Sequence, residues 1–273
     1  MRAEMDLKEK VKSFWNEHPL CSYEIKEEPG TLEFFERHNS IREEVEKYAK
    51  GFCEFESSRN LKLLDIGCGT GWVVCEYARH GAEVTGIDLT EAATLIARKR
   101  LQLYGLNADI KEADAENLPF EDESFDMVTS MGVLHHTPDT QKALDEIHRV
   151  LRKNGKFIIS LYYKNILLRD GVFPVFIRLL KLLKVGMHGI KDLKGNISLQ
   201  EFINYYDGKD NPLGKAYSYP ELKNMLGKFK NLEMEPHYFP VRFLPFRKLI
   251  PETLVRLPDK YLGFLVYVKG QKA

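Results

Sequence analysis

From residue 61 to residue 163, the sequence alternates short apolar runs of strand length with longer amphipathic segments of helix length. This alternation is the strongest constraint on the fold, because strands joined by helical crossovers pack as a mainly parallel sheet with helices on its faces. In such a sheet, ligands bind at the carboxyl ends of the strands. The pattern therefore predicts an α/β fold and also the edge of the sheet that carries the site.

Residues typical of helix ends lie at the boundaries of the predicted helices. Thr90 suits the N-cap of one helix, and Gly81 and Gly105 follow the ends of two helices. The predicted strands are LKLLDIG (61–67), AEVTGID (82–88), NADIKEADA (107–115), SFDMVTSMGVL with its exit loop (124–134) and KFIISLYY (156–163). The predicted helices between them are TGWVVCEYARHG (70–81), TEAATLIARKRLQLYG (90–105) and TPDTQKALDEIHRVLRKNG (137–155).

The alternation stops after residue 163 and resumes near residue 218, which divides the chain into four parts. We expect a helical N-terminal extension that covers the ligand site (1–60), an α/β core (61–163), an insertion or lid (164–217) and a C-terminal part that completes the sheet (218–273). In the last part, a helix is predicted at 218–229 and strands at 231–239 and 261–271.

The composition is that of an ordinary globular protein, with 44% hydrophobic and 29% charged residues. The N-terminus, MRAEMDLKEKVK, lacks the apolar region of a signal peptide, and no stretch reaches the roughly 18 apolar residues of a membrane span. We therefore expect a cytoplasmic protein. Cys21, Cys53, Cys68 and Cys75 form no CxxC pair, which predicts free thiols and no zinc or disulfide framework.

The net charge of zero conceals an uneven distribution. Residues 1–163 carry 21 Lys and Arg against 30 Asp and Glu, a net −9, whereas residues 164–273 carry 19 against 10, a net +9. The basic part is compatible with an ordinary solvated surface or with a surface that binds an anionic partner such as RNA.

The loop after the first predicted strand carries three glycines, in LDIGCGTGW (residues 64–72). The third glycine of a dinucleotide-binding G-x-G-x-x-G motif would fall at Trp72, and no Gly-Lys-Ser/Thr follows as in a Walker loop, so phosphate binding is disfavoured. Glycines let the backbone approach a ligand closely. With Asp65 just before them, they favour a small cationic ligand.

Carboxylates also follow the next two strands. Asp88 ends the second strand, where it can accept hydrogen bonds from a ribose diol. After the third strand, Asp114 and the backbone of Ala115 suit the amino group and ring nitrogen of an adenine.

Five segments between residues 61 and 163 together resemble the class I S-adenosylmethionine-dependent methyltransferases, especially those acting on small molecules, quinones and sterols. The segments are LDIGCGTG, VTGIDL, EADAENLPFEDESFDMV, GVLHHTPD and EIHRVLRKNGKFIIS, in the order and spacing of that family. The resemblance implies a doubly wound, Rossmann-like, mainly parallel sheet of seven strands with an insertion after the fifth. It also implies S-adenosylmethionine as cofactor.

The resemblance also assigns cofactor contacts, with the glycine loop at the methionine part, Asp88 at the ribose and Asp114 at the adenine. Trp15 and Tyr23 of the N-terminal extension are expected to close over the cofactor, although a plain core role suits Trp15 as well. The full set of implied contacts is Asp65, Gly67, Cys68, Gly69, Gly71, Asp88, Leu89, Asp114, Ala115, Ser130 and Met131.

The loop after the fourth strand, SMGVLHH, bears on the methyl acceptor. It lacks the Asn/Asp-Pro-Pro-aromatic motif of amino-group DNA methyltransferases and the adjacent carboxylates of catechol-type metal sites, so no metal is expected. His135 and His136 remain as candidate general bases for a hydroxyl acceptor, since imidazole titrates near neutral pH. The alternative is that this loop only shapes the acceptor pocket.

The insertion contains the remaining candidates. FPVFIRLLKLLKVGMH (173–188) predicts a basic amphipathic helix with Arg178, Lys181, Lys184 and His188 on one side. It can be a lid, an acceptor channel, a peripheral membrane contact or an ordinary packed helix. The candidate acceptor contacts in the following loop are Tyr205, Tyr206, Asp207 and Tyr217.

These features together predict an enzyme that methylates a small, largely apolar acceptor at oxygen, nitrogen or carbon. An RNA methyltransferase that uses the basic C-terminal half is the alternative, although nucleic acid is the less expected partner. A cofactor-binding protein without catalysis is the third class. The oligomeric state, the acceptor and the methylated atom are not indicated by the sequence.

Overall fold

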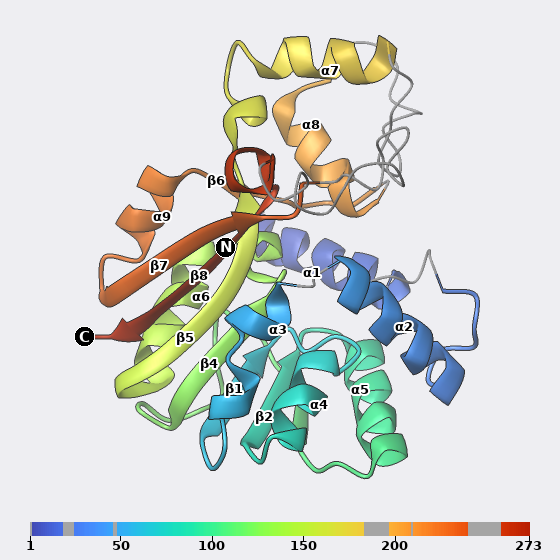
Figure 1. The fold of residues 1–273 in the computed structure, drawn as a ribbon, viewed down its shortest axis with the longest axis vertical. Coiled ribbons are helices and arrows are strands. Elements are labelled where there is room, and N and C mark those ends of the chain that lie inside the picture. The colour runs from blue at the N-terminus through green and yellow to red at the C-terminus, as the bar shows by residue number, and fades with distance from the viewer. Residues whose placement is uncertain (1, 19–24, 46–47, 183–196, 209, 240–257) are drawn as a thin grey trace.

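The alternating segments form one mixed sheet in the computed structural model, which describes residues 2–18, 25–45, 48–182, 197–208, 210–239 and 258–273 (Figure 1). The strands are β1 (Lys62–Ile66), β2 (Glu83–Asp88), β3 (Asp109–Glu112), β4 (Phe125–Met131), β5 (Leu151–Tyr163), β6 (Ala216–Tyr217), β7 (Phe229–His237) and β8 (Leu265–Lys272). Their order is β3-β2-β1-β4-β5-β8-β7, and β6 pairs with β5 beside this path. Strands β1 to β6 pair in parallel, and β8 runs antiparallel to both β5 and β7. The predicted mainly parallel, seven-stranded sheet is thus confirmed, with the two-residue β6 as an addition.

Helices cover both faces of this sheet (Figure 1). Side chains of α6 and α9 share one buried core cluster with the sheet, and side chains of α3, α4 and α5 share a second. The α-helices are α1 (Arg2–Glu17), α2 (Leu32–Val45), α3 (Ala49–Phe52), α4 (Trp72–Arg79), α5 (Glu91–Tyr104), α6 (Thr140–Val150), α7 (Phe173–Leu182), α8 (Leu199–Asn204) and α9 (Tyr219–Met225). Short 3-10 helices are η1 (Phe55–Ser57), η2 (Leu134–His136), η3 (Ile166–Leu168) and η5 (Tyr205–Asp207).

Successive strand residues alternate between the two core clusters, as a pleated strand requires. Leu63 of β1 lies in the cluster with α4 and α5, whereas its neighbour Leu64 lies in the cluster with α6. Because both faces are buried, the central strands are apolar throughout, which explains the short apolar runs in the sequence.

Most predicted boundaries lie within a few residues of the observed ones, and two are wrong. The strand predicted to begin at residue 261 begins at Leu265, because residues 258–262 are helical. Thr90 caps α5 by accepting a hydrogen bond from the backbone of Ala93, and Gly105 ends the helix in the left-handed conformation, as predicted. The helix predicted to reach residue 155 instead ends at Val150, and β5 begins at Leu151. The reason is that Leu151 already has extended backbone angles and pairs with Phe125 of β4, before an irregularity in the register.

The insertion has its own small core. Phe173 and Ile177 of α7 and Phe202 of α8 are buried with Tyr162 at the end of β5. Of the predicted basic helix, the described part is α7, and Lys184 and His188 lie outside the described residues, as does Tyr23. Within the described part of the chain, no helix combines the length and apolar character needed to span a bilayer. Cys53, Cys68 and Cys75 are buried and form no disulfide among the described residues, and Cys21 lies outside the described residues.

A buried arginine ties the N-terminal extension to the glycine loop. The guanidinium of Arg100 on α5 donates to the side-chain oxygen of Asn39 at 2.7 Å and to the carbonyls of Thr70 and Phe35 at 3.2 and 3.4 Å. Its side chain is 1% exposed, and burial lowers the pKa of Arg100 to about 10. A charged group in this position fixes α2 beside the loop that follows β1.

We expect Arg100→Met to destabilise the protein by roughly 2–4 kcal/mol, because it leaves several buried acceptors without a donor. Urea unfolding followed by circular dichroism measures this loss. Lys99→Met, an exposed neighbour on the same helix, is the control and should change stability by less than about 0.5 kcal/mol. Equal stabilities of the two variants would contradict the tethering role of Arg100.

Candidate functional site

The glycine loop is held in a conformation that favours glycine. Gly67 and Gly69 have φ angles of +72° and +50°. A Cβ atom at Gly67 would lie 2.3 Å from a methyl of Val133, whereas one at Gly69 would meet nothing within 4 Å. Gly67 is thus required by close packing against the loop after β4, and Gly69 leaves open space beside the backbone.

Asp88 organises this loop from the end of β2. Its Oδ2 accepts a hydrogen bond from the backbone N–H of Gly69 at 3.0 Å. Its Oδ1 accepts bonds from the backbone N–H and the hydroxyl of Thr90, both at 2.9 Å. The carboxylate therefore joins the end of β1 to the start of α5.

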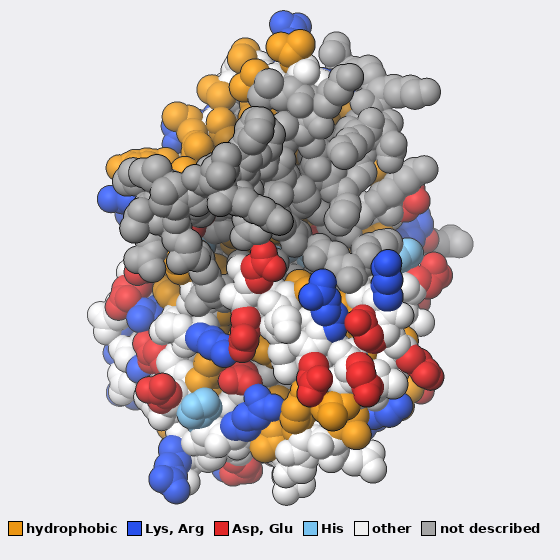
Figure 2. Space-filling model, turned by 45° about the vertical axis from the view of Figure 1, so that its right-hand side comes forward, with side chains coloured by type: hydrophobic (Ala, Val, Ile, Leu, Met, Phe, Trp, Pro, Cys, Tyr) orange, Lys and Arg blue, Asp and Glu red, His pale blue; other side chains and the backbone are white. Residues whose placement is uncertain are grey.

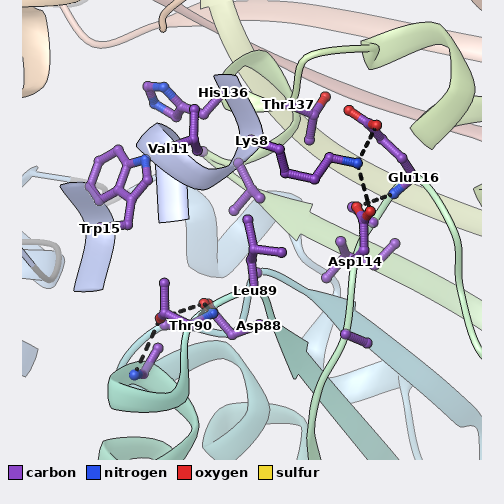
Figure 3. A pocket seen from close by; sticks show the side chains of 18 of the residues that line it. Lys8, Val11, Trp15, Asp88, Leu89, Thr90, Asp114, Glu116, His136 and Thr137 are labelled. Carbon is purple, nitrogen blue, oxygen red and sulfur yellow. Dashed lines mark hydrogen bonds and ion pairs between the residues drawn. The ribbon is translucent and has the colours of Figure 1, made fainter. Parts of the chain in front are cut away.

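A pocket with about 1020 Å³ of empty space, its open mouth included, lies at the carboxyl ends of β1, β2, β3 and β4 (Figure 3). Helix α1 covers it from the other side. The lining residues are Lys8, Val11, Trp15, Ile66, Gly67, Gly69, Thr70, Asp88, Leu89, Thr90, Ala93, Ile96, Ala113, Asp114, Ala115, Glu116, Met131, Gly132, Val133, His136, Thr137 and Pro138.

Of the predicted cofactor contacts, seven lie on this pocket wall and four lie behind it. Those on the wall are Gly67, Gly69, Asp88, Leu89, Asp114, Ala115 and Met131. Behind it, the Asp65 carboxylate accepts a hydrogen bond from the hydroxyl of Thr129 at 2.7 Å, and the hydroxyl of Ser130 donates to the carbonyl of Ile66 at 3.0 Å. The remaining two of the four are Cys68 and Gly71.

Lys8 of α1 reaches two carboxylates that follow β3, those of Asp114, the predicted adenine contact, and Glu116. Its Nζ atom lies 2.6 Å from Asp114 Oδ2 and 2.6 Å from Glu116 Oε2 (Figure 3). Burial lowers the pKa of Lys8, but the hydrogen bonds to both carboxylates outweigh this effect, so its pKa is raised. These ion pairs connect α1 to the opposite rim of the pocket.

The sequence reasoning missed Lys8 and Val11, although a signal was present. Lys8, Val11 and Trp15 are spaced i, i+3 and i+7, which places them on one face of a helix. All three line the pocket. Such spacing identifies a helix face that makes a contact, but it does not identify what the face contacts.

The two candidate histidines differ in position. His136 lines the pocket, and its ring centroid lies 4.9 Å from that of Trp15. Its Nδ1 lies 2.5 Å from the carbonyl oxygen of Leu213, and its Nε2 lies 3.0 Å from Asp207 Oδ2. His135 is absent from the pocket lining and is 1% exposed, and burial holds its pKa well below its usual range.

The insertion residues proposed as acceptor contacts form the outer wall behind His136. Tyr205, Tyr206 and Asp207 make up η5, and the hydroxyl of Tyr162 donates a hydrogen bond to Asp207. The hydroxyl of Tyr217 donates to that of Thr140 at 2.8 Å. None of these four insertion residues is part of the pocket lining.

Buried carboxylates make the site acidic. Burial raises the pKa of Asp65 to about 7, and the nearby charge of Asp88 acts in the same direction. Burial also raises the pKa of Asp88. A cationic ligand would favour the ionised forms of these groups, because an opposite charge offsets the cost of burying a carboxylate.

The sequence and the fold were compared with those of known proteins. Residues 64–159 match a family model described as "Methyltransferase domain". Sterol 4-C-methyltransferase strm-1 of Caenorhabditis elegans is 36% identical over 108 residues, which cover 39% of this chain and 32% of that protein. A phthiotriol/phenolphthiotriol dimycocerosates methyltransferase of Mycobacterium tuberculosis is 42% identical over 98 residues, which cover 35% of this chain and 36% of that protein.

The similarity thus spans about a third of the length of these two curated relatives. The crystal structure of YcgJ from Bacillus subtilis aligns with 84% of this chain and 97% of its own, with a TM-score of 0.51 and 19% identity. That likeness concerns the fold.

We expect Lys8→Met to increase amide hydrogen exchange in residues 2–17 about fivefold, because roughly 1 kcal/mol of partly exposed ion pairing is lost. Exchange followed by mass spectrometry measures the effect. The control is Lys10→Met, whose ion-pair partner, Asp6, lies within α1. Unchanged protection of α1 in Lys8→Met would show that these ion pairs do not hold the helix over the pocket.

The raised pKa of Asp65 predicts a pH dependence of stability. In the unfolded chain this group ionises near pH 3.9, but in the folded protein it does so near pH 7. Between these values the folded state binds more protons, so its stability falls as pH rises. The Asp65→Asn variant lacks this ionisable group, so its stability does not fall in the same way. The stability of the variant relative to the unmodified protein should therefore increase from pH 4 to 7, by about 1.4 kcal/mol per unit of difference between the folded and unfolded pKa.

Urea unfolding at several pH values measures this difference. Glu83→Gln serves as the control, because it removes a carboxylate that is 73% exposed. Parallel pH profiles of Asp65→Asn and the unmodified protein would contradict the assignment.

Proposed function

We infer that this chain, whose residues 64–159 match a family model described as "Methyltransferase domain", is a class I, S-adenosylmethionine-dependent enzyme that transfers a methyl group to a small, largely apolar acceptor. This inference rests on the pocket in which the glycine loop, Asp88 and Asp114 lie together under α1. Its acidic wall suits the cationic cofactor, and its position at the carboxyl ends of parallel strands is where this fold binds ligands.

The described residues fit the cofactor. The open space beside Gly69 admits a ligand close to the backbone, as the methionine part requires. We assign the ribose hydroxyls to Asp88 and the adenine to Asp114 and Ala115, with Leu89 against the ring. When bound, S-adenosylmethionine supplies an activated methyl group on its sulfonium.

The contribution of the protein is alignment and exclusion of water. Helix α1 covers the pocket, and Trp15 on this helix lies against His136. The Lys8 ion pairs hold α1 across the rim. Because Lys8 occupies the carboxylate assigned to the adenine amino group, we expect α1 to shift when the cofactor enters.

Both ring nitrogens of His136 contact other protein groups, so neither is placed to take a proton from the acceptor. One ring nitrogen contacts the Leu213 carbonyl, and the other contacts Asp207. We therefore assign His136 to the acceptor end of the pocket, where the insertion holds it in place. His135 lies behind it, outside the pocket lining.

The insertion supports an apolar acceptor. Aromatic side chains dominate its core, where the rings of Tyr206 and Phe264 stack with centroids 5.6 Å apart and Tyr206 lies 5.0 Å from Tyr162. The names of the two curated relatives refer to a sterol and to a dimycocerosate, both rich in hydrocarbon. We propose that Tyr205, Tyr206 and Asp207 border the acceptor and that Tyr217 supports them.

Helix α7 supports an additional peripheral membrane contact. It buries Phe173 and Ile177, yet Val175, Leu179 and Leu182 on the other side are 63%, 50% and 79% exposed. Figure 2 shows hydrophobic side chains gathered at the end of the molecule where α7 lies. An apolar acceptor dissolved in a membrane would be reached from this end.

The cofactor assignment is tested with Asp88→Ala. We expect its affinity for S-adenosylmethionine to fall by about 1.5–3 kcal/mol, roughly ten- to a hundredfold, because hydrogen bonds to a charged group are lost. Isothermal titration calorimetry measures the affinity, and circular dichroism verifies folding. Glu83→Ala, on the same strand and 73% exposed, is the matched control. Equal affinities of the two variants would exclude the proposed role of Asp88.

A further inference from the structure

Three potential metal ligands meet where the insertion contacts the pocket wall. His135 and His136 come from η2 after β4, and Asp207 comes from η5 in the insertion. One nitrogen of each histidine and one oxygen of Asp207 all lie within 4.8 Å of one another. Within the described residues, this is the one group of three or more His, Cys, Asp and Glu side chains close enough to share an ion.

The contacts of His136 leave Nε2 as the nitrogen that can bind a metal ion. A carbonyl oxygen can only accept a hydrogen bond, so the contact with Leu213 assigns a proton to Nδ1. In the neutral form of the ring, the lone pair is then on Nε2, which faces Asp207 Oδ2 at 3.0 Å. Two acceptors at this separation need a positive charge, either an extra proton or a cation that both of them bind.

The other two ligands are also held in place. The hydroxyl of Tyr162 donates to Asp207 and orients its carboxylate. The ring of Tyr162 also lies 3.7 Å from the ring of His135, centroid to centroid. His135 Nδ1 is buried without a hydrogen-bond partner among the described residues, although most buried polar atoms have one.

We propose that His135, His136 and Asp207 bind one divalent transition-metal ion at the wall of the pocket. Neighbouring ligands of a tetrahedral or octahedral ion with bonds of about 2.1 Å lie roughly 3.0–3.4 Å apart. His136 Nε2 and Asp207 Oδ2 already have this separation. The nitrogen of His135, within 4.8 Å of both, reaches it after a side-chain shift of at most about 1.5 Å. Two imidazoles and a carboxylate suit Zn²⁺, Fe²⁺ or Mn²⁺ and leave coordination positions open.

The position of His136 indicates what an open coordination position would take. His136 lines the pocket, and Asp207 belongs to the segment that we assign to the acceptor. An oxygen of the acceptor, such as a hydroxyl, is the expected additional ligand, a step that rests on the proposed function. A bound hydroxyl would be oriented and made more acidic by the ion.

Cobalt(II) titration of the metal-free full-length protein tests the site. We expect a visible d–d absorption that saturates at one equivalent and is displaced by Zn²⁺. Asp207→Asn keeps an acceptor for Tyr162 but loses the anionic ligand, and it should weaken Co²⁺ binding at least about tenfold. The matched control, Asp210→Asn, changes an exposed carboxylate of the same loop and should bind as the unmodified protein does.

Tyr162→Phe is a second variant that keeps all three ligands and removes only the support of Asp207. It should weaken Co²⁺ binding less than Asp207→Asn does, with circular dichroism verifying that both variants fold. Absence of the saturable band, or equal binding by Asp207→Asn and the control, would overturn the site and leave an imidazolium–carboxylate ion pair.

The same preparations separate this inference from the proposed function. Calorimetric binding of S-adenosylmethionine to a protein that shows no cobalt band would overturn the metal site alone. A saturable cobalt band without any cofactor binding would support the site and overturn the proposed function.

Discussion

The hydrogen bonds that Asp88 accepts hold the site together. Its carboxylate receives the backbone N–H of Gly69 and two donors of Thr90, so it joins the loop after β1 to the N-terminus of α5. The loop is further anchored because the backbone N–H groups of Gly67 and Cys68 both donate to the carbonyl of Ile87, at 2.7 and 2.8 Å. These bonds fix the path of the loop over the ends of β1 and β2.

This arrangement concentrates negative charge at one edge of the sheet. The carboxylates of Asp65 and Asp88 lie close together, and burial raises the pKa of both. Glu116 and Asp114 add two more carboxylates, and Lys8 of α1 offsets one of their two charges. The site is therefore less favourable for the empty protein than for a complex with a cation, and that difference can contribute to ligand affinity.

The insertion lies behind the end of the pocket that His136 lines. It supplies the Leu213 carbonyl and the Asp207 carboxylate, which hold His136, while its aromatic core packs on Tyr162 at the end of β5. In the proposed function, the cofactor and the acceptor are therefore assigned to different parts of the chain. We assign the glycine loop and the strand ends to the cofactor and the insertion to the acceptor.

The sequence by itself determined the order of strands and helices, the glycine loop, and the position of Asp88 and Asp114 at strand ends. These depend on periodicity, capping and spacing over a few residues, which local physical chemistry sets. Only the tertiary structure decided that Asp65 lies behind the pocket wall, that β5 begins at Leu151, and that Asp207 meets His136. The Lys8–Asp114 and His136–Asp207 contacts join segments 106 and 71 residues apart, and such pairs form only because packing of the whole chain brings distant segments together.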